Sequence, residues 1–366
     1  MSTKRSYIAA AALMTAVTVI GADNLEACTR AVYIGASNMV ITGRTMDWGE
    51  DIFSNAWVFP QGMTRDGAPG IKNGIQWTSK YGSLVVSGYE SGTADGMNEA
   101  GLVANLLYLS ESEYGDDKSG KKPILTIAAW AQYVLDNFGS VAETVKGLQA
   151  EPFHIMAPIL PNGKGAQLHL SISDPSGDSA VFEYVKGRLV IHHGSEYRVM
   201  TNSPSYAEQL AIQAYWKNIN GMNFLPGTIN AADRFVRTSF FIDAIPKQLD
   251  KNTINAVPSA TYENQAIASV MSVMRSVGVP LGVTDPDKPN LSSTLWRTAY
   301  DHKNKVFYFD SATSPNTFWV PLSDLDFRKG AAVKKLTIAG GKVYAGNAAS
   351  KFEPAEPFKF LSADAK

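Results

Sequence analysis

The chain contains a single cysteine, Cys28, and its position is the first indication of chemistry. It follows Ala27, a small residue of the kind that precedes secretory cleavage sites. Cleavage there would make Cys28 the first residue of the mature chain, with both a thiol and a free α-amine. The reference pKa is near 8.5 for a thiol and about 7.7–8.0 for an α-amine, so the amine can accept the thiol proton at neutral pH. Nucleophile and general base would then lie on one residue.

The residues ahead of the cysteine have the pattern of a secretory signal peptide. Lys4 and Arg5 are followed by an uncharged, mostly apolar stretch from Ile8 to Ala22. This stretch is shorter than the roughly 18 apolar residues that indicate a membrane-spanning helix. We therefore predict that residues 1–27 are removed and that residues 28–366 form the mature chain. We expect this chain to be periplasmic and to contain no integral membrane segment.

Two other interpretations of Cys28 stay open at this point. Leu25-Glu26-Ala27-Cys28 partly matches a lipid-attachment site, although glutamate fits poorly there, and a lipidated cysteine could not act as a nucleophile. Free cysteine is also a common small core residue.

Signal cleavage could instead occur after Ala22, which would leave residues 23–27 for later removal. A lone cysteine in an exported protein cannot form an internal disulfide, so a reactive thiol or an intermolecular link is expected.

Composition limits the class of protein. The 366 residues are 45% hydrophobic and 18% charged, as in an ordinary globular protein. Lys and Arg total 33 and Asp and Glu total 34, giving a net charge of -1. This balance supplies no excess of cations for phosphate, so nucleic acid is not an expected partner. No repeat or clean linker divides the chain, and we expect one domain over residues 28–366.

The elements that would position Cys28 begin with a hairpin. Residues 28–34 and 40–48 are expected strands, and the turn residues 35–38 lie between them. Such a hairpin brings Arg44 and Asp47 back beside the cysteine. Arg44 would favour the thiolate, and Asp47 could orient the α-amine. Taken alone, an Arg and an Asp near a strand end more often form a surface ion pair.

The remaining pattern alternates helices with blocks of antiparallel strands. Further strands are expected at 81–89, 102–109, 169–174, 180–184, 188–191, 294–300 and 305–310. Helices are expected at 124–135, 140–148, 231–245 and 262–277. This order favours a layered α+β sandwich.

Five short motifs then occur in order along the chain. They are Cys28-Thr29-Arg30; Gly43-Arg44-Thr45-Met46-Asp47-Trp48; Asp95-Gly96-Met97-Asn98-Glu99-Ala100-Gly101-Leu102; Thr201-Asn202-Ser203-Pro204; and Leu225-Pro226-Gly227 with Asp233-Arg234-Phe235-Val236-Arg237. Together they resemble the choloylglycine hydrolase family of N-terminal nucleophile hydrolases, which includes penicillin V acylases and conjugated bile salt hydrolases. The resemblance implies a four-layer αββα sandwich with two antiparallel sheets.

The same resemblance implies a set of site residues. The expected catalytic residues are Cys28, Arg44, Asp47, Asn202, Arg234 and Tyr108. The oxyanion would be held by the Asn202 side chain and the backbone N–H of Tyr108. Asp233 stands where the family has serine, which leaves open whether Arg234 or Arg237 takes the arginine role. Tyr108 stands where bile salt hydrolases have asparagine, as in penicillin acylases of the family, whereas Asn105 would face the opposite side of the strand.

The expected function is an exported amidohydrolase that cleaves a linear, non-peptide amide. Penicillin V acylase activity is favoured, with acyl-homoserine-lactone acylase activity beside it; a bile salt hydrolase or a lipid-anchored binding protein without catalysis is the alternative. Met46 and Trp48, with Tyr108, could line an acyl pocket, although each could equally be a core residue. No metal-ligand spacing or cofactor motif occurs, so neither is expected. The apolar-rich segment 206–224 is a candidate arm for a homotetramer.

Overall fold

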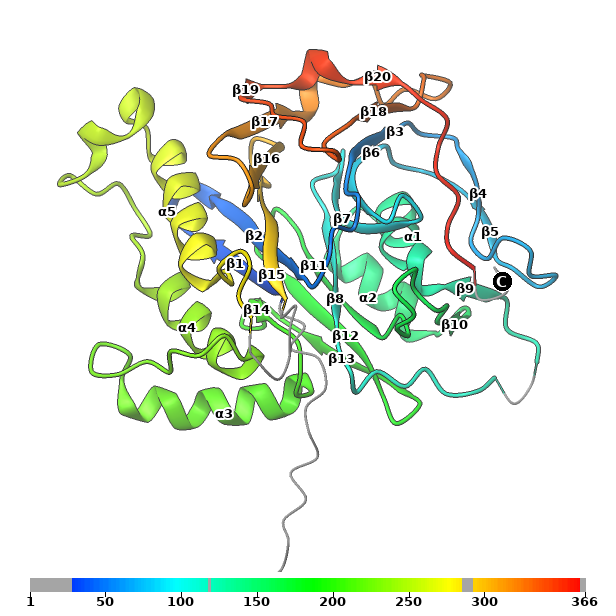
Figure 1. The fold of residues 1–366 in the computed structure, drawn as a ribbon, viewed down its shortest axis with the longest axis horizontal. Helices are drawn as coiled ribbons and strands as arrows, with labels where there is room; N and C mark the ends of the chain where they lie inside the picture. Colours follow the sequence, from blue (N-terminus) through cyan, green and yellow to red (C-terminus); the bar gives the residue numbers. More distant parts are fainter. Residues whose placement is uncertain (1–27, 118–119, 285–291, 363–366) are drawn as a thin grey trace, which may run out of the picture.

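The computed structural model describes residues 28–117, 120–284 and 292–362. The predicted signal peptide, residues 1–27, lies outside the described residues. Within them, two large sheets lie side by side between two groups of helices (Figure 1). This four-layer αββα arrangement confirms the predicted fold class. No helix in these residues is long and apolar enough to cross a membrane.

The first sheet has seven strands in the order β14-β1-β2-β15-β16-β17-β19. Their bounds are β1 (Thr29–Ile34), β2 (Val40–Trp48), β14 (Val199–Met200), β15 (Ser293–Asp301), β16 (Val306–Ser311), β17 (Thr317–Pro321) and β19 (Gly346–Asn347). All neighbours are antiparallel except β17 and β19. The predicted hairpin is present: β1 and β2 are antiparallel, with Thr29 opposite Thr45 and Arg30 opposite Arg44.

The second sheet has nine strands in the order β13-β12-β11-β8-β7-β6-β3-β18-β20, all antiparallel. Their bounds are β3 (Ala56–Phe59), β6 (Ser83–Gly88), β7 (Gly92–Asn98), β8 (Val103–Tyr108), β11 (Leu168–Ser173), β12 (Ser179–Val185), β13 (Arg188–His193), β18 (Lys334–Leu336) and β20 (Glu353–Pro354). Polar contacts join the sheets: Thr42 of β2 and Ser173 of β11 are hydrogen-bonded at 2.6 Å, and the Thr298 hydroxyl donates to Asp95.

Helices cover the outer face of each sheet. The first sheet is covered by α4 (Ala231–Ala244) and α5 (Tyr262–Val277), and α3 (Tyr206–Ile219) contacts α4 (Figure 1). The second sheet is covered by α1 (Trp130–Asn137) and α2 (Val141–Gln149). Gly43 allows the close approach of α5 to β2, because a Cβ there would lie 2.8 Å from Met274 and 2.9 Å from Val270.

One predicted helix begins later than expected. The apolar run that starts at residue 124 first forms β9 (Ile124–Thr126), which pairs in parallel with β10 (His154–Met156); β4 (Thr64–Asp66) and β5 (Gln76–Thr78) form a second small ladder. A short 3-10 turn (Ile127–Ala129) follows, and α1 begins only at Trp130. The prediction of a helix from 124 was wrong because a distant strand pairs with its first residues.

Candidate active site

Cys28 lies just before β1 and beside β2, and it is 2% exposed. Its sulfur lies 3.9 Å from the sulfur of Met46 and 3.6 Å from the backbone oxygen of Asp47. Both neighbours come from β2, so the antiparallel register of the hairpin places the thiol. Burial raises the pKa of the Cys28 thiol above its ordinary value, while the charge of Arg44 acts in the opposite direction.

Arg44 and Asp47 lie on opposite faces of β2, because an odd spacing on a strand reverses the direction of the side chain. The Arg44 guanidinium is fully buried and reaches the second sheet, where it donates to the carbonyl oxygens of Ala94 (3.0 Å) and Leu106 (2.9 Å). It lies 4.0 Å from the carboxylate of Asp95. Arg44 therefore acts on Cys28 from the layer between the sheets.

The Asp47 carboxylate is fully buried on the other face of β2. It accepts hydrogen bonds from the hydroxyls of Thr45 (3.0 Å) and Thr294 (2.5 Å), and a guanidinium nitrogen of Arg234 lies 3.9 Å away. Burial raises the pKa of Asp47 to about 6, against the lowering effects of Arg234 and of the two threonine hydroxyls. Strand β15 shifts register just after Thr294, and this irregularity accompanies the contact with Asp47.

Asn202 joins Cys28 to the second sheet. Its side-chain oxygen accepts a hydrogen bond from the backbone nitrogen of Cys28, and its amide nitrogen donates to the backbone oxygen of Tyr108 at 2.7 Å. The turn that carries Asn202 is itself held in place. The side-chain amide of Gln209 donates to the backbone oxygens of Asn202 and Pro204, and a ring nitrogen of the buried His169 contacts the Thr201 oxygen at 2.9 Å.

The structure separates the two candidate arginines of α4. Arg234 is fully buried and donates to the backbone oxygen of Cys28 (2.7 Å) and to the side-chain oxygen of Asn202 (3.0 Å). Arg237 lies about one turn further along the helix and donates to the backbone oxygens of Pro226 and Thr228, both at 2.7 Å. Arg234 is therefore the arginine that contacts Cys28.

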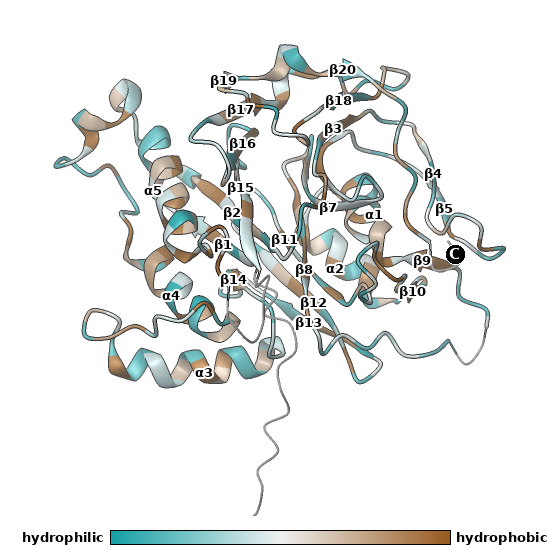
Figure 2. Cartoon of the chain, viewed as in Figure 1, coloured by the Kyte–Doolittle hydropathy of each residue, from teal (hydrophilic) through white to brown (hydrophobic). Residues whose placement is uncertain are grey.

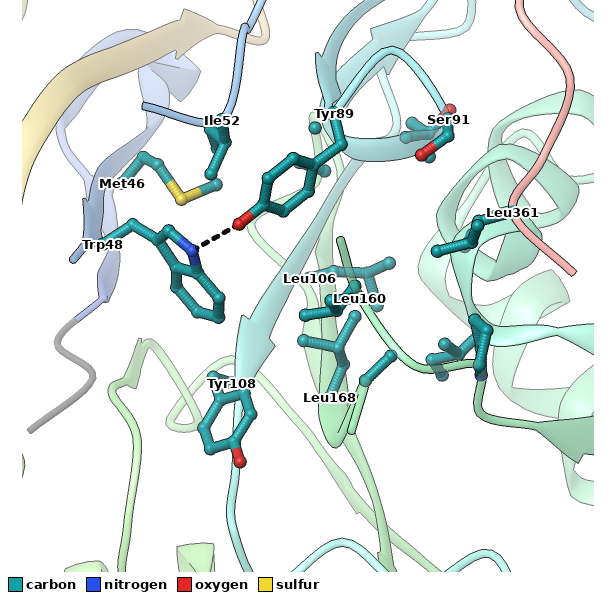
Figure 3. Close-up of a pocket in the computed structure, with 18 of the residues that line it drawn as sticks. Met46, Trp48, Ile52, Tyr89, Ser91, Leu106, Tyr108, Leu160, Leu168 and Leu361 are labelled. Atoms are coloured by element: carbon teal, nitrogen blue, oxygen red, sulfur yellow. Dashed lines mark hydrogen bonds between the residues drawn. The ribbon is translucent and has the colours of Figure 1, made fainter. Parts of the chain in front are cut away.

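An apolar cavity of about 100 Å³, which opens to solvent, lies next to Cys28 (Figure 3). Met46, Trp48 and Tyr108, which were expected there, all line it. The rings of Trp48 and Tyr108 meet edge to face, with centroids 6.0 Å apart. The indole nitrogen of Trp48 donates to the Tyr89 hydroxyl at 2.8 Å, as Figure 3 shows. Such a cavity suits an aromatic or aliphatic acyl group.

Several residues of this region were missed from the sequence. Thr45 could have been found, since it lies two residues before Asp47 and shares its face of the strand. The sequence around Thr294 and around Tyr89 contains no motif that indicates a role in the site. The aliphatic residues of the cavity could not be distinguished by sequence from ordinary core residues. This last group is Ile52, Leu106, Ile127, Leu160, Leu168 and Leu361. Among the described residues, no group of three His, Cys, Asp or Glu side chains could hold a metal ion.

Comparison with known proteins identifies the family of this chain. The family model described as linear amide C–N hydrolases, choloylglycine hydrolase family, matches residues 28–334, beginning at the cysteine. The chain belongs to the choloylglycine hydrolase family. It is thus a linear amide C–N hydrolase, as its sequence motifs predicted.

Within the choloylglycine hydrolases, the chain is similar to penicillin V acylases. A penicillin V acylase of Pectobacterium atrosepticum is 44% identical over 98% of both chains. The solved structure of a penicillin V acylase from Agrobacterium tumefaciens is 53% identical and covers 92% of this chain and 100% of its own, with a TM-score of 0.82. A conjugated bile acid hydrolase from Clostridium perfringens shares the fold at 19% identity, with a TM-score of 0.70 over 87% of this chain and 98% of its own.

Proposed function

We propose that this protein is an exported penicillin V acylase that uses Cys28 as an N-terminal nucleophile. The observation that carries the proposal is the position of Cys28, whose thiol lines an apolar cavity while Asn202 and Arg234 hold its backbone. Two proteins similar to this chain, at 44% and 53% identity, are penicillin V acylases. Acyl-homoserine-lactone acylase activity is a second proposed activity, because a linear acyl chain also suits an apolar cavity.

The proposed reaction has two halves. The α-amine of Cys28 takes the thiol proton, and the thiolate attacks the amide carbonyl carbon to form a tetrahedral intermediate. Collapse of this intermediate breaks the C–N bond, leaves a thioester on Cys28, and passes the proton to the departing amine. A water molecule, activated by the same α-amine, then attacks the thioester and releases the carboxylic acid and the free thiol.

Two donors are proposed for the oxyanion. The amide nitrogen of Asn202 carries two protons and gives one to the Tyr108 oxygen, so its second proton is proposed to point at the substrate. The backbone N–H of Tyr108 belongs to the same residue as the oxygen that fixes Asn202. Preorganised donors of this kind are commonly the largest single contribution to such reactions.

The three charged residues are given separate roles. Arg44 is proposed to stabilise the thiolate from the layer between the sheets, since its charge lowers the pKa of the buried Cys28 thiol. Asp47 is proposed to orient the α-ammonium group once residues 1–27 have been removed. Arg234, which donates to the Cys28 oxygen, is proposed to fix the backbone from which both groups extend.

Export and processing are part of the proposal, because the free α-amine exists only after residues 1–27 are lost. We propose a periplasmic location on the basis of the basic start and apolar stretch of this segment. An intact-mass measurement of the mature protein tests it. A mass equal to that of residues 28–366 is expected, whereas added diacylglycerol and acyl mass would support the lipid-anchored binding protein and exclude Cys28 catalysis.

The substrate is tested with amides of three classes at equal concentration: penicillin V, a long-acyl homoserine lactone and glycocholate. We expect the largest kcat/KM for penicillin V and measurable turnover of the lactone. Faster hydrolysis of glycocholate would instead make the protein a bile salt hydrolase. Hydrolysis of penicillin V would also give the protein a role in antibiotic degradation.

We also propose that the protein is a homotetramer. Helix α3 and the residues after it show both apolar and polar residues (Figure 2), and Tyr215, Met222 and Phe224 are 64%, 80% and 59% exposed. Such a surface favours an interface between copies. Light scattering at micromolar concentration should give the mass of four chains, and a monomer would contradict this part of the proposal.

A further inference from the structure

The C-terminal tail, residues 355–362, follows β20 and contributes one residue to the cavity. No motif of the sequence indicated this residue. Leu361 lines the same cavity as Cys28, although the two residues are 333 positions apart in the chain. Figure 3 shows Leu361 on the opposite side of the cavity from Met46, with Leu106, Leu160 and Leu168 between them. Because the thiol of Cys28 lies 3.9 Å from the Met46 sulfur, Leu361 lies at the end away from the nucleophile.

Hydrogen bonds fix the tail at this position on both sides. The backbone N–H of Leu361 donates to the oxygen of Ser91, which lies between β6 and β7, at 2.7 Å. The hydroxyl of Thr126, the last residue of β9, donates to the backbone oxygen of Leu361 at 2.5 Å. The tail therefore bridges two elements, and the Leu361 side chain has a defined place in the wall.

The preceding residues anchor the tail in the hydrophobic core, where Phe360 and residues of α1 belong to one cluster. Phe360 is 6% exposed, and its ring stacks with Trp77 at a centroid distance of 6.3 Å. It also meets the ring of Phe358 at 5.7 Å. Buried aromatic contacts of this kind resist displacement, so a substrate that reaches Leu361 meets a wall held by the folded core.

The chemistry of this end of the cavity is apolar. Ile127 and Ala128, which directly follow Thr126 in the chain, line the cavity together with Leu361, and Ser91, whose backbone oxygen accepts the Leu361 N–H, is a polar residue of the same lining. The end of an acyl group furthest from its amide would contact these side chains. The family match ends at residue 334, so Leu361 lies beyond the matched residues.

We infer that Leu361 is a specificity-determining residue, and that the C-terminal tail sets the length of the acyl group that the enzyme accepts. The inference rests on the proposed function, in which the cavity binds the acyl group of the amide. A chain that ends before Leu361 is accommodated, and a longer chain meets the leucine side chain. In a hydrophobic pocket, one methylene changes kcat/KM by about 10- to 200-fold.

The test uses linear acyl amides of one leaving group, para-nitroaniline, from hexanoyl to dodecanoyl. Leu361→Ala removes three carbons from the wall, so the acyl length of maximal kcat/KM should increase, and the ratio for long over short amides should rise at least about tenfold. Leu361→Phe should move the optimum to shorter chains. Leu249→Ala, the same change at a residue that is 45% exposed and outside the cavity, should leave the ratio unchanged.

Melting temperatures of the variants separate specificity from folding. Opposite shifts by Leu361→Ala and Leu361→Phe in folded protein would support the inference. An unchanged chain-length profile in either folded variant, with normal hydrolysis by the wild type, would overturn the inference and leave the proposed function standing. A wild-type protein that hydrolyses penicillin V but none of the acyl amides would overturn this inference alone, and one that hydrolyses neither would overturn the proposed function as well.

Discussion

The backbone nitrogen of Cys28 donates a hydrogen bond to the side-chain oxygen of Asn202, although 174 residues separate them in the chain. The other end of the same amide group donates to the Tyr108 oxygen. One asparagine thus connects the start of β1 to the end of β8, across the two sheets. The oxyanion proposal depends on this connection, because it places a side-chain N–H beside the residue that carries the thiol.

Replacing Asn202 with alanine removes that N–H. We expect Asn202→Ala to lower kcat by about 10²–10³, with a smaller effect on KM, because an oxyanion donor acts mainly in the transition state. Steady-state kinetics with penicillin V measure it. Asn347→Ala, at an exposed asparagine on β19, is the matched control and should keep wild-type kcat. A kcat for Asn202→Ala within a few-fold of wild type would contradict the assignment.

The two arginines of α4 provide a matched pair. Arg234→Lys keeps the charge but cannot bridge Cys28 and Asn202 through a planar fork, so the nucleophile should be misplaced. A displacement of about 1 Å can cost about 10²-fold, and we expect a loss of that size in kcat/KM. Arg237→Lys should retain activity within a few-fold. Melting curves identify any general loss of folding, and equal activities of the two variants would show that Arg234 has no special role.

The hydroxyl of Thr294 should control the ionisation of Asp47. Asp47 orients the α-ammonium only as a carboxylate, so activity should rise with pH as this group loses its proton. Burial raises the pKa of Asp47 to about 6, and Arg234, the Thr294 and Thr45 hydroxyls and Arg297 all act to lower it. The Cys28 thiol also interacts with Asp47. The α-amine of Cys28, with a reference pKa of about 7.7–8.0, is a second group that must lose its proton on the acid side of the profile. Removing one stabilising donor therefore raises the pKa of Asp47 further.

We expect Thr294→Val to move the acid limb of kcat/KM to higher pH by about one to two units, since a hydrogen bond to a charged group contributes about 1.5–3 kcal/mol. Thr294→Ser keeps the hydroxyl and should restore the wild-type limb. The pH profile distinguishes this effect from a structural one, which would lower activity at all pH values alike. An unshifted acid limb in Thr294→Val would exclude the role of this hydroxyl.

Local patterns were sufficient to predict much of this site. A short turn joins residues 28–34 to 40–48, so the hairpin register followed from the sequence, and it placed Arg44 and Asp47 beside Cys28. The structure adds that the two side chains lie on opposite faces of β2, which their odd spacing explains. Asn202 and Arg234 were indicated by the family resemblance, and the structure brings both into contact with Cys28.

Long-range contacts account for what the sequence did not reveal. Thr294 lies 247 positions from Asp47, and nothing in its neighbourhood on β15 indicates that contact. Leu361 reaches the cavity only because the tail crosses from Ser91 to Thr126. The false helix start at Ile124 has the same cause, since a strand more than 25 positions away pairs with these residues, as His154 opposite Ile124 shows. The periodicity of apolar residues along a sequence indicates which side chains are buried, but it does not indicate which distant residues they contact.

The central claim is that the α-amine of Cys28 is the general base, and one comparison of two N-termini tests it most directly. A retained residue ahead of Cys28 converts the amine into an amide, which cannot accept a proton at neutral pH. A cytoplasmic form that begins Met-Ala-Cys28 and keeps its alanine should therefore be nearly inactive, and a form that begins Met-Cys28 and loses its methionine should be active. Penicillin V turnover is measured for both, with N-terminal sequencing of the assayed protein. Normal turnover by protein that demonstrably retains the alanine would contradict the account.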